Sequence, residues 1–236
     1  MPDPMHFEAQ AAHYTLARPP YPQDLWDTIF QLDALRPGCR VLDLGAGTGQ
    51  ATGPLVARGL RVTAVERGPQ LAAQLKGAHP SATVVRARAE DMELSKATFD
   101  AVVAATSIHW LDLDVVLPKV HDLVVPKGKF LVFRNVFGDS AVTTPFREKV
   151  AEIVRLRNSP NRNDTENAHT TAADLTHARL FEVEDISTYR WSITLDEQQV
   201  RGLFSPSVTG VPTRWTALVT PCATLGDRSS SITPRG

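Results

Sequence analysis

The stretch from Val41 to Gly49 constrains the fold more than any other part of the chain. It reads VLDLGAGTG, an apolar run with one carboxylate that leads into glycines at every second position. Such a run is typical of a buried strand, and alternating glycines are typical of a tight turn whose backbone a ligand can approach. We expect a helix over Gln50–Arg58, whose first N–H groups would face the same turn. The stretch therefore predicts a site for a nucleotide-like ligand.

The glycine spacing and the carboxylate limit which ligand fits this turn. The spacing is G-x-G-x-G, and Gln50 stands where a dinucleotide fingerprint carries its third glycine. Asp43 precedes the first glycine by two residues, and a carboxylate there repels a pyrophosphate and attracts an ammonium group. We therefore expect a ligand that carries a positive amine and no phosphate.

Strand and helix patterns alternate on both sides of this turn. The runs suited to strands are Arg40–Leu44, Arg61–Glu66, Thr83–Arg86, Phe99–Ala105 and Lys129–Phe133. The helical patterns between them are Gln50–Arg58, Pro69–Ala78 and Leu113–Leu123. Further on, Leu180–Ile193 alternates like a strand with one exposed face, and we expect it to join the sheet as an antiparallel member. The pattern predicts an α/β, Rossmann-like, doubly wound fold with a mostly parallel sheet of about seven strands and an antiparallel C-terminal strand or hairpin.

The two ends of the chain differ from this regular part. We expect residues 1–36 to form a helical lid segment, residues 37–204 the ligand-binding domain, and residues 205–236 an irregular tail. The composition of Gly226–Gly236 predicts disorder, so the sequence leaves open whether the last strand of the sheet exists. A missing strand would expose a sheet edge and favour a homodimer.

Charge and cysteine content narrow the classes of partner. A net charge of −1 and a pI near 6.7 give no case for nucleic acid or an anionic membrane as a partner. Cys39 and Cys222 are isolated in the sequence, which argues against a zinc site or a disulfide framework, and we expect no metal. No segment has the pattern of a signal peptide or a transmembrane helix. The expectation is a cytoplasmic protein with a small-molecule partner.

Two later segments can contribute to the same site. Glu66 ends the second strand, where an acidic residue can accept hydrogen bonds from both hydroxyls of a ribose. Residues 104–112 follow the fourth strand, and ligands in open α/β sheets lie beyond the carboxyl ends of strands. His109 and Trp110 are therefore expected beside the reactive part of the ligand, with packing alone as the alternative.

These residues resemble the class I S-adenosylmethionine-dependent methyltransferases. Val41–Gly49 matches their first motif, and Glu66 matches the second, in which an acidic residue holds the ribose. The pattern A-A-x-x-x-H-W that ends at Trp110, together with Y-x-x-x-R-P-x-Y-P from Tyr14 to Pro22, resembles a bacterial subgroup of these enzymes. The resemblance covers residues 7–136 and implies S-adenosyl-L-methionine as the cofactor.

The resemblance also implies roles for individual residues. Arg18 would pair with the cofactor carboxylate, and His109 would be the general base, with Tyr14 and Tyr21 as orienting groups. Ala89 or Glu90 would reach the amino group of adenine. The residues expected to bind the cofactor are Arg18, Asp43, Gly45, Ala46, Gly47, Thr48, Gly49, Glu66, Ala89, Glu90, Ala105 and Thr106.

Three functions stay open at this point. The first is methyl transfer to an oxygen, nitrogen or carbon nucleophile of a small molecule. The second is an NAD(P)-dependent oxidoreductase of Rossmann type, which Asp43 and the missing third glycine at Gln50 disfavour. The third is a non-catalytic binding module that keeps the cofactor fold. If the acceptor is already deprotonated, no base is needed and His109 would only shape the pocket.

Overall fold

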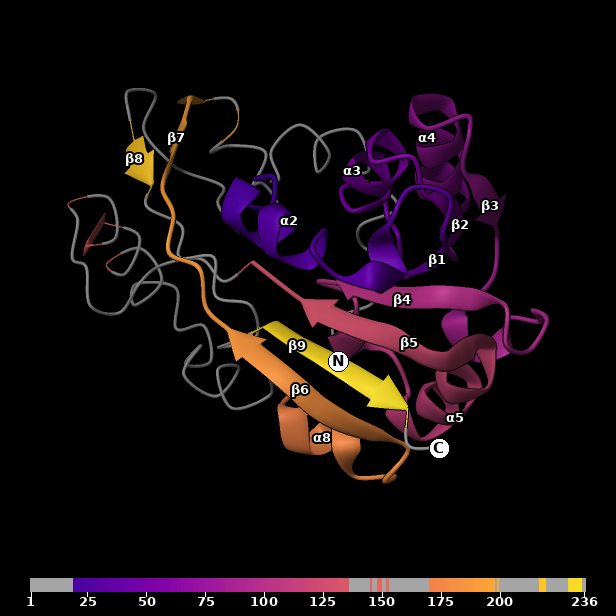
Figure 1. Cartoon of the computed structure of the whole chain (residues 1–236). Coiled ribbons are helices and arrows are strands. Elements are labelled where there is room, and N and C mark those ends of the chain that lie inside the picture. The colour runs from indigo at the N-terminus through magenta and orange to yellow at the C-terminus, as the bar shows by residue number, and fades with distance from the viewer. Residues whose placement is uncertain are drawn as a thin grey trace.

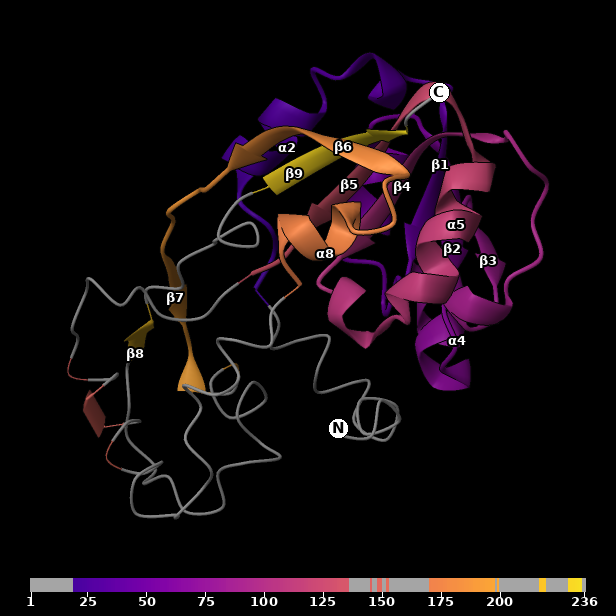
Figure 2. The ribbon, with the colours of Figure 1, turned by 90° about the horizontal axis from the view of Figure 1, so that it is seen from below.

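The structure, a computed structural model, describes residues 19–135, 170–197 and 199, the positions 145, 148, 149 and 152, and the segments 217–219 and 229–234. Its centre is a sheet with helices on both faces (Figures 1 and 2). Among the described helices, none is both long and apolar enough to cross a membrane.

Five neighbouring strands of the sheet are parallel. Their order is β3 (Thr83–Val85), β2 (Arg61–Val65), β1 (Arg40–Leu44), β4 (Phe99–Ala105) and β5 (Val124–Phe133). The chain builds outward from β1 in one direction and then crosses to β4, so the strand order reverses between β1 and β4. The predicted Rossmann-like, doubly wound fold is confirmed, and the glycine turn lies at this reversal point.

Two more strands complete the sheet beyond β5. Strand β9 (Ser229–Pro234) pairs antiparallel with β5 on one side and with β6 (Phe181–Ser187) on the other. The prediction that Gly226–Gly236 lacks regular structure is wrong for β9, because pairing with two neighbouring strands outweighs its weak local pattern. Strand β6 joins the sheet through antiparallel pairing with β9, so the expected antiparallel C-terminal hairpin is confirmed; β9 is the strand that runs against the rest of the sheet, and β6 runs in the same direction as β5. Since β9 covers β5, that edge is not exposed.

Apolar side chains fill both faces of the sheet. On one face, α2 (Gln23–Ile29) and α3 (Thr52–Ala57) pack through residues such as Trp26 and Leu55. On the other face, α5 (Leu113–Leu123) and α8 (Ala172–Thr176) pack through residues such as Leu117. The remaining described elements are α4 (Pro69–Ala78), the 3-10 turns η2 (Asp33–Leu35), η3 (Ala89–Asp91) and η4 (Ile108–Trp110), and the separate pair β7 (Ile193–Leu195) and β8 (Ala217–Val219).

Candidate functional site

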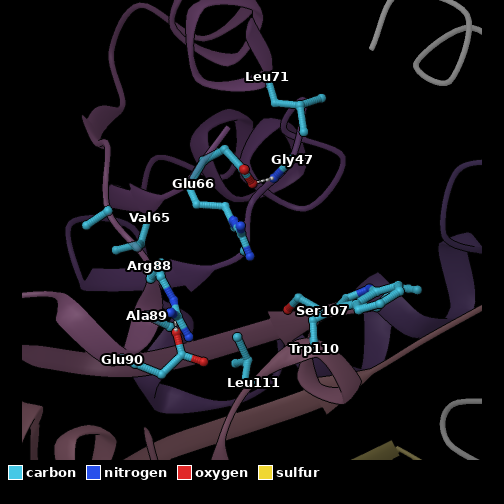
Figure 3. Close-up of a pocket in the computed structure, with 14 residues that line it drawn as sticks. Gly47, Val65, Glu66, Leu71, Arg88, Ala89, Glu90, Ser107, Trp110 and Leu111 are labelled. Carbon is cyan, nitrogen blue, oxygen red and sulfur yellow. Dashed lines mark hydrogen bonds and ion pairs between the residues drawn. The ribbon is translucent and has the colours of Figure 1, made fainter. Parts of the chain in front are cut away.

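A cleft with about 830 Å³ of empty space, part of it open to solvent, lies at the carboxyl ends of the central strands (Figure 3). Its walls come from the turn after β1, the end of β2, the loop after β3 and the segment after β4. The lining residues are Gly45, Gly47, Val65, Glu66, Arg67, Leu71, Ala87, Arg88, Ala89, Glu90, Thr106, Ser107, Trp110 and Leu111. The cleft therefore occupies the position where an open α/β sheet binds its ligand.

Two glycines of the turn are needed for different reasons. Gly45 has φ +63°, and a Cβ there would lie 2.7 Å from Cβ of Ser107, so the end of β4 could not approach β1. The Ser107 hydroxyl donates to the carbonyl of Leu44 at 2.5 Å and fixes that approach. Gly47 has φ +58°, and a Cβ there would meet no atom within 4 Å. Gly45 thus closes the sheet, whereas Gly47 keeps the floor of the cleft free for a ligand.

Asp43 lies directly behind the turn and is almost completely buried, with 1% exposure. Its Oδ2 accepts a 2.7 Å hydrogen bond from the Thr52 hydroxyl, while its Oδ1 is buried without a partner among the described residues. Burial raises the pKa of Asp43 from 3.8 to about 6, the negative charge of Glu66 adds to the increase, and the bond from Thr52 opposes it. An unpaired buried carboxylate oxygen behind an open turn fits the ammonium group of an amino-acid ligand.

Replacing Asp43 by asparagine is expected to raise the unfolding free energy of the chain and to lower its affinity for a ligand with an ammonium group. The folded-state pKa lies above the ordinary value, so the stability that Asp43 contributes is present in acid and is lost as pH rises from 3.8 to about 6. Above that range D43N should therefore gain roughly 3 kcal/mol in unfolding free energy, and the gain should vanish below about pH 4. Denaturant unfolding of D43N and of the unchanged protein, once above about pH 6 and once below about pH 4, measures this difference. Equal stability of the two proteins near neutral pH would contradict the charge cost assigned to Asp43.

Glu66 connects the turn after β1 to the end of β2. Its side chain is 5% exposed; Oε2 accepts from the backbone N–H of Gly47 at 2.8 Å, and Oε1 accepts from that of Gly68 at 2.7 Å. Figure 3 shows the carboxylate reaching Gly47 beside the cleft. The two bonds hold the carboxylate in one orientation, from which its remaining lone pairs can accept hydrogen bonds from a diol.

The loop after β3 forms the far wall of the cleft. Glu90 accepts from the Arg88 side chain at 3.3 Å and from the backbone N–H of Asp112 at 3.0 Å. Burial works to raise the pKa of Glu90, but the Asp112 N–H and the Arg88 guanidinium together hold it below its usual value. Glu90 therefore ties this loop to the start of α5, and Ala89 is buried beside it.

The segment after β4 places its aromatic residues differently from the expectation. His109 on η4 is exposed and does not line the cleft, whereas its neighbour Trp110 does, with ring centroids 4.8 Å apart. Thr106 lines the cleft in a left-handed conformation, φ +57°, which costs a β-branched residue about 1–2 kcal/mol. The hydroxyl of the buried Tyr21 lies 2.7 Å from the Thr106 hydroxyl.

The structure brings about half of the predicted site residues to the cleft. Those that line it are Gly45, Gly47, Glu66, Ala89, Glu90 and Thr106, with Asp43 behind the turn. Those placed nearby but not on its wall are Tyr21, Ala46, Thr48, Gly49, Ala105 and His109. Tyr14 and Arg18 lie outside the described residues.

Seven residues that line the cleft were not predicted from the sequence to contact a ligand. They are Val65, Arg67, Leu71, Ala87, Arg88, Ser107 and Leu111. All of them except Leu71, which lies on α4, stand within three residues of a strand end or a predicted site residue, so their position along the chain was the available signal. The side-chain direction that decides whether such a residue lines the cleft depends on local backbone geometry, which the pattern does not specify.

The part of the chain that carries the cleft matches a known protein family in sequence. Residues 42–132 match the family model described as a methyltransferase domain. An uncharacterized methyltransferase of Mycobacterium tuberculosis is 36% identical over 125 residues, which are 53% of this chain and 50% of the relative. The chain thus spans about half the length of this relative.

Solved structures share the fold at lower sequence identity. The YcgJ protein of Bacillus subtilis has a TM-score of 0.56 and 16% identity, over 91% of this chain and 99% of that protein. Phosphoethanolamine N-methyltransferase 2 of Haemonchus contortus, solved in complex with S-adenosyl-L-methionine, has a TM-score of 0.51 and 19% identity, over 78% of this chain and 44% of that enzyme. All residues that line the cleft fall within the segment that matches the methyltransferase domain.

Proposed function

We propose that the chain is an S-adenosyl-L-methionine-dependent methyltransferase that acts on a small-molecule acceptor. The observation that carries the proposal is the combination of an open glycine at Gly47 with the buried, unpartnered Oδ1 of Asp43. The fixed carboxylate of Glu66 adds an acceptor for the ribose hydroxyls. The three residues would recognise three features of this cofactor, namely its amine, its ribose diol and the absence of a phosphate.

The work of the protein in such a reaction is mainly positioning. The bound cofactor supplies an electrophilic methyl group on a sulfonium, so no metal and no protein nucleophile is required. Glu66 and the glycine turn would fix the cofactor, and Ala89, Leu111 and Trp110 would exclude water from the cleft. Because His109 does not line the cleft, it would act as a general base only for a neutral acceptor bound outside the cleft wall beside η4, and a carboxylate acceptor would need no base. Tyr14 would orient the acceptor, and Arg18 would pair with the cofactor carboxylate.

The oxidoreductase alternative is less well supported. A dinucleotide needs a phosphate-binding turn, and Asp43 would put a negative charge behind it. The Gln50 side chain donates to the carbonyl of Pro19 at 3.3 Å, so position 50 contributes a side-chain contact where a dinucleotide fold carries glycine or alanine. These features favour the sulfonium ligand.

Calorimetry with S-adenosylhomocysteine and with NAD⁺ separates the candidate functions. The proposal predicts one binding site for S-adenosylhomocysteine and no heat from NAD⁺ under the same conditions. Binding of NAD⁺ alone would support an oxidoreductase and overturn the proposal. Binding of S-adenosylhomocysteine, with no transfer of labelled methyl to any acceptor in a broad panel, would favour a non-catalytic module.

A further inference from the structure

The segment Pro19–Tyr21 crosses the carboxyl ends of the central strands and is held there at several points. The side-chain amide of Asn135, just after β5, donates to the carbonyls of Pro19 and Pro20 at 3.3 Å each. The amide of Gln50, next to the glycine turn, also donates to the Pro19 carbonyl. Because proline has no backbone N–H, Pro19 and Pro20 can form backbone hydrogen bonds only through their carbonyls. The segment is therefore a fixed part of the site's surroundings.

The ring of Tyr21 is locked in one position by aromatic neighbours. It packs edge-on against Phe133 with centroids 4.8 Å apart and against Trp26 with centroids 6.0 Å apart. With 5% exposure, Tyr21 is part of the core between α2 and the sheet. Its hydroxyl meets the Thr106 hydroxyl at 2.7 Å, and the residue does not line the cleft itself.

Thr106 needs such support because of its backbone conformation. A β-branched residue rarely adopts φ +57°, and it keeps this conformation only where the surroundings enforce it. The Thr106 N–H donates to the Phe133 carbonyl at 2.7 Å, and Tyr21 holds the side chain. The next residue, Ser107, closes β4 onto the glycine turn. A change in the conformation of Thr106 would therefore move the wall of the cleft that faces Gly45 and Gly47.

We propose that Tyr21 is a positioning residue that acts through Thr106, holding the end of β4 in the left-handed conformation that shapes the cofactor cleft. This inference rests on the proposed methyltransferase function and deepens it. It differs from a role in which the Tyr21 hydroxyl orients the acceptor directly. Tyr21 shapes the site from the core, and Thr106 carries its effect to the cleft.

The test is a set of single and double substitutions, with affinity for S-adenosylhomocysteine as the readout. Y21F keeps the packed ring and removes only the hydroxyl, and its affinity should fall about fivefold to tenfold. Glycine adopts φ > 0 without restraint, so Y21F should have no further effect in a T106G background. T106S keeps the hydroxyl and should keep the sensitivity to Y21F. Y189F, at a partly buried tyrosine of the same core, is the matched control and should bind as the unchanged protein does.

Denaturant unfolding without ligand gives a second readout of the coupling. The effects of Y21F and T106G on the unfolding free energy should not be additive, because each variant removes one partner of the same Tyr21–Thr106 hydrogen bond. If the unchanged protein does not bind S-adenosylhomocysteine, the proposed function fails and the positioning role fails with it. If the unchanged protein and Y21F bind equally well, only the positioning role is overturned. An equal loss from Y21F in the Thr106 and T106G backgrounds would mean that Tyr21 contacts the ligand directly, and it would also overturn the inference.

Discussion

Replacing Gly47 by alanine is expected to reduce affinity for S-adenosylhomocysteine at least about tenfold while the chain stays folded. The new methyl group would project into open space at the floor of the cleft, where no protein atom lies within 4 Å. The bound ligand would occupy that space, so the methyl group would clash with the ligand and not with protein atoms. Calorimetric titration of the G47A protein measures the loss.

The control for this experiment is alanine at Gly38. That glycine also has a positive φ, +91°, and also has no neighbour within 4 Å of a Cβ, but it precedes the opposite end of β1. Both substitutions carry a left-handed strain of about 1–2 kcal/mol, so G38A reports the effect of strain alone. If G38A weakens binding as much as G47A does, the loss reflects backbone strain and Gly47 does not form the floor of the ligand site.

Removing the carboxylate of Glu66 should have the second large effect, on both binding and stability. E66A leaves the N–H groups of Gly47 and Gly68 without their acceptors, which should lower the unfolding free energy by about 1–3 kcal/mol. Loss of the hydrogen bonds that the ribose hydroxyls would donate to this charged acceptor should weaken S-adenosylhomocysteine binding by roughly 3 kcal/mol, more than a hundredfold. Calorimetry and denaturant unfolding measure the two effects separately.

Two further glutamate variants make the Glu66 experiment specific. E66Q keeps one acceptor oxygen, so it should lose less stability than E66A, and it should lower the pKa of Asp43 because a neighbouring negative charge is removed. E93Q changes an exposed glutamate that does not line the cleft, and it should leave binding unchanged. Unchanged affinity in E66A would contradict the assignment of Glu66 to the ribose.

Much of the fold follows from local pattern because the central strands are buried on both faces. The apolar run of β4 and the amphipathic pattern of α5 predicted the bounds of Phe99–Ala105 and Leu113–Leu123 correctly. Strand β9 was missed for the opposite reason. Its sequence, SSSITP, has little apolar periodicity, and its strand conformation depends on backbone pairing with β5 and β6.

The candidate site could be predicted where its geometry is set by the backbone. Strand ends and glycine spacing located Gly47 and Glu66, since the topology brings the carboxyl ends of β1 and β2 together. The same reasoning could not separate His109 from Trp110, because the 3-10 turn η4 decides which of the two side chains faces the cleft. The left-handed conformation of Thr106 is a tertiary effect that no local pattern encodes.

Determining the crystal structure of the chain with S-adenosylhomocysteine tests the central claim most directly. The account predicts the ligand in the cleft at the carboxyl ends of β1, β2 and β4, with its amine at the turn in front of Asp43 and its ribose hydroxyls at Glu66. The part of the ligand between its amine and its ribose should pass over Gly47 without displacing the turn. A ligand bound elsewhere on the chain, or a ribose that makes no contact with Glu66, would contradict the account.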